Sequence, residues 1–184
     1  MNELEFLKIY WQQYMILEKR MINLSDYVAI HPKNSATFSN QFISMYLTIC
    51  SEIDSVAEEF CKNLNIDEKS RFGINNKINH ILNKYDKLKN WRVDTKFPHY
   101  RINIVPFAKF NDNKSSDWWQ TYNNIKHKRT EKIGEQYNYE LANLKNVLNA
   151  LAALYLLLYK MREENYNCSE IKFESRLFDI NYIQ

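Results

Sequence analysis

The sequence predicts an all-α fold, a single-domain helical bundle, and three observations support this prediction. Only two glycines and three prolines occur among the 184 residues, so long stretches contain nothing to interrupt a helix. Apolar side chains recur at three- and four-residue steps through several of these stretches. Thirteen tyrosines, ten phenylalanines and four tryptophans supply large rings for a core. A chain of this length can bury one substantial core, so we expect one domain over residues 1–184.

Two long helices are predicted in the first third of the chain. Residues 3–28 form the first, and the side chains expected to face the core are Leu4, Leu7, Tyr10, Trp11, Tyr14, Leu17, Met21 and Leu24. Pro32 and the polar residues after it predict a break, because proline restricts its predecessor and polar clusters favour turns. Residues 39–64 form the second helix, whose expected apolar side contains Phe42, Met45, Tyr46, Ile49, Ile53, Val56, Ala57, Phe60 and Leu64.

A third helix is predicted over residues 74–88, with His80 on its polar surface. Residues 91–113 then lose the helical period and contain two prolines, which predicts a long irregular connection. A short extended piece is expected at residues 101–105. Because the connection leads into the next helix, it could form one wall of a cleft there, or it could be a packed loop.

Residues 118–129 predict the helix around which the chain is organised. Ser115, Ser116 and Asp117 are residue types that begin helices, and helical character is lost near Gly134. One stripe of this helix holds Trp118, Tyr122, Ile125 and Arg129, and the neighbouring stripe holds Trp119, Asn123, Lys126 and His127. The first stripe can be buried, whereas the polar groups of the second have little structural use beside two tryptophans.

The last long helix is predicted over residues 139–165, where alanines interleave with leucines and permit close helix packing. The tail at residues 168–184 has apolar residues without a helical period. We expect it to pack in extended form against the body of the protein or against a partner chain.

Charge is distributed unevenly along the chain. Residues 67–134 contain fifteen Lys and Arg against seven Asp and Glu, a net charge of +8, while the two flanks together carry −5. An anionic partner such as RNA should therefore contact the middle third. The alternative is an ordinary solvated surface rich in lysine.

Several classes of protein are not expected. The first five residues lack the pattern of a signal peptide, which predicts a cytoplasmic protein. The longest apolar run, residues 150–159, is half of what a membrane span needs, so no membrane contact is predicted. Three cysteines without a CxxC pair predict reduced thiols. No histidine follows a glutamate by three residues, so neither a di-metal centre nor a cofactor is expected.

The pattern WWxxYNxxKHxR at residues 118–129, followed by an Ala- and Leu-rich closing helix, resembles bacterial HEPN-like proteins. The resemblance implies a helical bundle that commonly forms homodimers, and many members are metal-independent ribonucleases of toxin–antitoxin and phage-defence systems. The family motif is an Arg, usually followed by Asn or another polar residue, and a His four to six positions after the Arg. Asn123 and His127 match its later part, whereas Tyr122 occupies the position of the arginine, and tyrosine supplies no cation there.

RNA cleavage without a metal requires a base, an acid and cationic groups for the phosphate. His127 is the candidate acid–base group, because imidazole titrates near neutral pH. Asn123, one turn earlier, could orient His127 or bond a phosphate oxygen. Lys126, Lys128, Arg129 and Tyr122 are the candidate phosphate or RNA contacts. One histidine per chain is few for both roles, which favours a homodimer with two such helices face to face.

Three functions remain open from the sequence. The first is a metal-independent endoribonuclease of a phage-defence or toxin–antitoxin system. The second is a non-catalytic HEPN-like module that binds a nucleotide, a nucleic acid, an antitoxin or another protein, and Tyr122 favours it. The third is a metal-dependent helical hydrolase, kept because Glu52, Asp54 and Glu58 share one helix. In the structural alternative, Asn123 and His127 are simply a satisfied buried pair.

Overall fold

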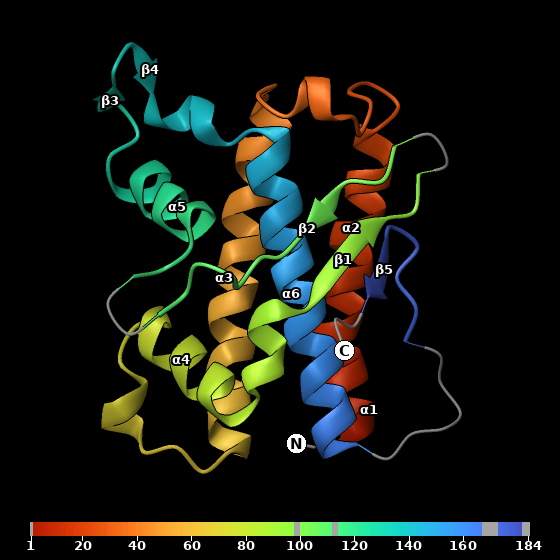
Figure 1. The fold of residues 1–184 in the computed structure, drawn as a ribbon, viewed down its shortest axis with the longest axis vertical. Coiled ribbons are helices and arrows are strands. Elements are labelled where there is room, and N and C mark those ends of the chain that lie inside the picture. Colours follow the sequence, from red (N-terminus) through yellow and green to blue (C-terminus); the bar gives the residue numbers. More distant parts are fainter. Residues whose placement is uncertain (1, 98–99, 112–113, 167–172, 182–184) are drawn as a thin grey trace.

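Two long central helices form the core of the protein. A computed structural model describes residues 2–97, 100–111, 114–166 and 173–181. Helix α3 (Asn40–Asn63) packs along α6 (Leu144–Asn165), in which every residue from Ala150 to Leu158 is buried. Ala150, Ala152 and Ala153 are fully buried, so their small side chains permit close packing around this helix. Figure 1 shows α3 and α6 side by side at the centre.

The N-terminal helix contains a π-helical turn that rotates its first residues relative to the rest, and the sequence pattern did not reveal this turn. It consists of α1 (Glu3–Phe6), a π-helical turn (Leu7–Trp11) and α2 (Gln12–Leu24), so it ends four residues before the predicted position. The prediction that Leu4 faces the core is wrong: Leu4 is 60% exposed, while Phe6 is fully buried. A π turn bonds residue i to i+5 and inserts one extra residue, which rotates the residues before it away from the expected face.

A small antiparallel sheet crosses the helices, so the fold is mostly helical and not strictly all-α. Its strands are β1 (Arg92–Thr95), β2 (Asn103–Ile104) and β5 (Phe178–Asn181), in the order β2-β1-β5. Strand β2 confirms the extended piece predicted at residues 101–105. The prediction missed the pairing because strands of two to four residues are too short to show a period.

The C-terminal tail supplies the third strand of this sheet. Strand β5 confirms that this part of the tail packs in extended form against the body of the protein. The rest of the predicted tail, residues 168–172 and 182–184, lies outside the described residues. The same holds for Cys168, whereas Cys50 and Cys61 are buried free thiols, as predicted.

The segment before β5 is fixed by a buried carboxylate. Glu18 of α2 is fully buried, and its oxygens accept hydrogen bonds from the Tyr14 hydroxyl (2.8 Å) and from the backbone N–H of Arg176 (3.1 Å) and Leu177 (3.2 Å). The Ser175 hydroxyl also donates to it. These bonds hold the residues that lead into β5.

The third helix is shorter than predicted. It is α4 (Ile74–Lys84), followed by the 3₁₀ turn η4 (Asp86–Asn90), because Tyr85 leaves the helical region with φ −127° and ψ 71°. His80 on α4 is half-buried, and its ring nitrogen lies 3.1 Å from the Ser70 carbonyl oxygen. Two further 3₁₀ turns, η2 (Pro32–Asn34) and η3 (Glu68–Arg71), lie in the loops before α3 and α4.

The motif helix is α5 (Asp117–His127), which ends two residues before the predicted end. A hairpin that the sequence did not predict follows, formed by β3 (Lys132–Ile133) and β4 (Gln136–Tyr137). Gly134 turns this hairpin with φ +64°, a conformation that favours glycine. The 3₁₀ turn η5 (Asn138–Leu141) then leads to α6, which begins five residues later than predicted. No helix in the described part of the chain is long and apolar enough to cross a membrane.

Candidate functional site on helix α5

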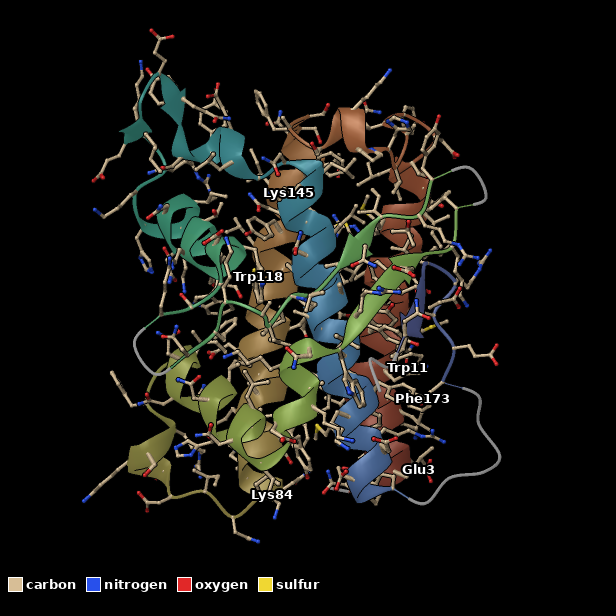
Figure 2. All side chains as sticks on the ribbon, viewed as in Figure 1. Glu3, Trp11, Lys84, Trp118, Lys145 and Phe173 are labelled. Atoms are coloured by element: carbon tan, nitrogen blue, oxygen red, sulfur yellow. The ribbon has the colours of Figure 1, made fainter. Side chains whose placement is uncertain are left out.

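Helix α5 is anchored at its N-terminal end by the connection that precedes it. The Ser116 hydroxyl and the Trp118 indole N–H both donate to the Pro106 carbonyl, at 2.8 and 2.9 Å. The Tyr46 hydroxyl of α3 donates to the Trp118 carbonyl. Trp118 thus fixes α5 on the side that faces the central helices (Figure 2). The connection is therefore a packed segment here that sets the position of the motif helix.

The two stripes of α5 differ in exposure as the helical spacing predicts, with two exceptions. Trp118, Tyr122 and Ile125 are buried, whereas Asn123, Lys126 and His127 are exposed. Arg129 belongs to the first stripe by spacing but is exposed, because it follows the end of the helix. Trp119 belongs to the second stripe but is only 5% exposed, and its ring centroid lies 4.9 Å from that of Tyr122.

Asn123 and His127 are not a buried pair. Both side chains are exposed at the C-terminal end of α5, one turn apart. Among the described residues, neither the His127 ring nor the Asn123 amide has a hydrogen-bond partner. The structural alternative, in which the two are satisfied within the core, is therefore wrong for this chain. Both groups are free to contact a ligand.

The side chain of Tyr122, unlike those of Asn123 and His127, is buried. Its side chain is 7% exposed, and its ring packs against Trp119 inside the core. Lys126 lies over the same ring, with its ammonium 5.6 Å from the ring centroid. The predicted role of Tyr122 as an RNA contact stays a prediction, and the burial of the ring leaves little surface for it.

Several cationic residues are close to His127 in the sequence, and some of their side chains already have partners. Lys128 pairs with Glu131 at 3.3 Å, with both side chains more than half exposed, so the pair is screened by water. Lys132 lies 4.4 Å from the centroid of the Tyr137 ring. Arg129 is exposed without a partner in the described residues. These cations also stabilise the C-terminal end of the helix dipole, which is the ordinary structural role of such residues.

A second group of cations gathers at the opposite end of α5. Lys109 pairs with Asp117 in the first turn. The hydrogen bond from Lys109, helped by the charges of Lys109, Lys114 and Lys145, lowers the pKa of Asp117. Sequence reasoning missed this group, because Lys145 comes from α6 and only the fold brings it near Asp117.

The acidic residues of α3 form ion pairs with α4 and the turn before it. Lys77 lies 2.9 Å from Asp54 and 3.3 Å from Glu58, and Arg71 lies 3.0 Å from Glu58. Within the described ranges, no three His, Cys, Asp or Glu side chains come together as a group able to hold a metal ion. Asp54 and Glu58 thus link neighbouring elements in this structure.

Five cavities of about 220–470 Å³ lie between described residues, and Asn123 and His127 line none of these five. One cavity of about 220 Å³ reaches Trp118 at the N-terminal end of α5. The side chains of Asn123 and His127 lie on an exposed surface of the single chain.

No family model, no curated protein and no solved structure matches this chain. The HEPN-like resemblance accordingly rests on the residues of the motif alone.

Proposed function

We propose that this protein binds RNA and cleaves it without a metal ion, at the exposed surface formed by Asn123, His127 and Arg129. The observation that carries the proposal is the exposure of His127 and Asn123 one turn apart, with unpaired hydrogen-bonding groups in the described structure. A purely structural helix would not need these groups. The HEPN-like pattern and its systems of phage defence and toxin–antitoxin pairs supply the biological setting of the proposal.

Each of these residues has a chemical role in the proposal. The His127 imidazole takes the proton from a ribose 2′-hydroxyl or returns one to the leaving 5′-oxygen. The Arg129 guanidinium binds the phosphate in place of the arginine that Tyr122 does not supply. The Asn123 amide bonds a phosphate oxygen or orients His127.

Two copies of the chain complete the site in this proposal. One surface holds one histidine, and cleavage needs both a base and an acid. Because His127 lies on an open surface, two copies related by a two-fold axis can face each other and enclose the RNA between two α5 ends. Lys126 and Lys128 then border the enclosed strand.

The test incubates the purified protein with single-stranded RNA in the presence of a chelator. The variants are His127→Ala, Asn123→Ala and Arg129→Ala, and the matched control is His80→Ala, which removes a histidine from α4. One well-placed acid–base group contributes about 10²–10⁴-fold, so His127→Ala should lower the cleavage rate by that factor. Equal cleavage by wild type and His127→Ala, or none by wild type, would remove the catalytic proposal.

A non-catalytic binding module is the second candidate. The buried Tyr122 in the arginine position and the open surface around His127 favour it. In that case RNA is bound but not cleaved, and Arg129→Ala weakens binding while His127→Ala leaves RNA intact as in wild type. Binding measured by fluorescence anisotropy, beside the cleavage assay, separates the two candidates.

A further inference from the structure

In the part of the chain that the structure describes, the outer edge of strand β2 is free of a pairing strand. Strand β1 is paired on both sides, with β2 on one side and β5 on the other. Figure 1 shows β2 in front of the first half of α6. A free edge presents unpaired N–H and C=O groups, which another extended chain can pair with.

The backbone of Asn103 faces this free edge. The Thr95 N–H donates to the Ile102 carbonyl at 3.1 Å, and Asp94 stands opposite Asn103 in the register. Hydrogen-bonded and non-bonded pairs alternate along an antiparallel ladder. The Asp94–Asn103 pair is therefore non-bonded, and the N–H and C=O of Asn103 point away from β1. No described residue accepts from or donates to them.

The free edge lies in a groove. Four consecutive residues, 102–105, line a cavity of about 390 Å³. Each face of a strand exposes only alternate residues, so four consecutive residues border one cavity only along the edge of the strand. The buried Leu144 and Leu148 of α6 form its floor, and its accessible apolar surface comes from Pro32, Ile102 and Val105. The Lys145 N–H donates to the Ser35 carbonyl at 3.0 Å, which ties the loop around η2 to the start of α6.

The groove continues at both ends and is basic. It shares His31 with a cavity of about 470 Å³ and Lys145 with the cavity of about 220 Å³ beside Trp118. The described residues that line the three cavities include the lysines Lys33, Lys109 and Lys145. They include a single acidic residue, Asp117, which already pairs with Lys109. Lys145, labelled in Figure 2, lies at the start of α6.

We propose that an extended, acidic segment of another protein binds in this groove as an additional strand beside β2. Its backbone pairs with the N–H and C=O of Asn103, and alternate apolar side chains contact the accessible apolar lining at Pro32, Ile102 and Val105. Its carboxylates face Lys33 and Lys145. Residues 102–105 span about 13 Å, enough to pair with about four residues of the segment.

The geometry favours this occupant over two others. A symmetric pairing of two β2 edges would bring Lys33 and Lys145 of one copy toward those of the other, whereas an acidic segment neutralises them. A nucleic acid would match the lysines, but its backbone carries no N–H donors to pair with the outward C=O of Asn103, and its phosphates gain nothing from the apolar surface of Pro32, Ile102 and Val105. These groups suit a peptide backbone with apolar side chains.

The test measures binding of fluorescein-labelled heptapeptides to the full chain by anisotropy. The first probe alternates glutamate and valine, the second replaces glutamate by lysine, and the third is the first with every second backbone amide N-methylated. Asn103→Pro removes the outward N–H, which β1 does not use. Asn103→Ala is the matched control, since it loses the same side-chain hydrogen bond to Asp94 but keeps the N–H.

We expect saturable binding of the acidic peptide, with affinity lowered at least about tenfold by Asn103→Pro and by N-methylation. Asn103→Ala should change affinity less than about twofold, Lys145→Glu should weaken binding of the acidic peptide, and the lysine peptide should bind weakly. Equal binding to the proline and alanine variants, or equal binding of the N-methylated peptide, overturns the proposal. So does the absence of saturable binding, or tighter binding of an oligouridylate at this groove.

Discussion

Glu18→Gln tests whether the buried carboxylate fixes the C-terminal segment. Glutamine keeps the shape of the side chain but replaces one acceptor oxygen by an NH₂ donor. The carboxylate accepts hydrogen bonds from Tyr14, Ser175 and the N–H groups of Arg176 and Leu177. In the variant, the NH₂ group of glutamine therefore faces at least one of these donors. An unsatisfied buried group costs about 1–3 kcal/mol.

Two further terms set the net magnitude. The remaining hydrogen bonds lose the assistance of a negative charge, which weakens each by about 1 kcal/mol. Replacing the charged carboxylate by a neutral amide recovers part of this lost stability, because burying a charge away from water costs free energy. We expect a net decrease of about 1–3 kcal/mol in the free energy of unfolding, and a Tm lower by roughly 5 °C.

The assay is urea unfolding followed by far-UV circular dichroism and tryptophan fluorescence at about pH 7. Hydrogen exchange should also accelerate at the Leu177 and Phe178 amides, which donate to the Ser175 hydroxyl at 3.0 and 2.8 Å. Glu135→Gln is the matched control, since Glu135 is exposed in the hairpin, and it should change stability by less than about 0.5 kcal/mol.

A double-mutant cycle with Ser175→Ala separates the cluster from two independent effects. Residues in one hydrogen-bond network couple by about 0.5–3 kcal/mol. An unchanged urea midpoint for Glu18→Gln, or strictly additive effects of the two substitutions, would show that the cluster does not hold the segment before β5.

Two further predictions concern contacts between helices. Burial alone would raise the pKa of Glu58, but the hydrogen bonds and charges of Lys77 and Arg71 lower it. The contribution of Glu58 is therefore present above its unfolded pKa of about 4.3 and is lost as pH falls through the lower folded pKa. Glu58→Gln should cost about 0.5–1 kcal/mol at neutral pH, and urea midpoints of the two proteins should converge below about pH 4; a constant difference would contradict this. Tyr46→Phe removes the hydroxyl that donates to the Trp118 carbonyl and should lower stability by about 0.5–1.5 kcal/mol, measured by urea unfolding; an unchanged midpoint would show that the bond contributes nothing.

Helix α3 shows what local patterns predict well. Its predicted range, residues 39–64, differs from Asn40–Asn63 by one residue at each end. The start is well defined because the Ser39 hydroxyl accepts from the Phe42 N–H at 3.1 Å, and this cap is visible as a residue type in the sequence. A long apolar period with a capping residue thus fixes a helix without knowledge of its neighbours.

The sheet and the buried carboxylate lie beyond such patterns. Arg92 pairs with Asn181, far along the chain, and nothing local to β1 indicates its partner. Glu18 would be expected on a solvated face by its residue type. Its burial depends on donors from residues 175–177, so only the folded chain reveals it.

The pattern of exposure along α5 was largely predictable from the sequence, whereas the surroundings of the candidate site were not. The helical period of α5 predicted that Tyr122 and Ile125 are buried beside an exposed Asn123 and His127. It did not predict the burial of Trp119. The Trp119 ring lies against the rings of Trp118 and Tyr122, with centroids 5.8 and 4.9 Å away, and a two-stripe reading of the helix does not reveal such packing.

The two proposed ligands bind at opposite ends of one helix, which makes the two proposals separable. Helix α5 has 11 residues and is therefore about 16 Å long. A peptide that reaches Trp118 from the groove ends near the N-terminal turn, whereas RNA would contact His127 at the last turn. Asn103→Pro should therefore leave RNA cleavage unchanged, and His127→Ala should leave peptide affinity unchanged. If either substitution alters both activities, the groove and the α5 end form one site, and a ligand must extend along the whole helix.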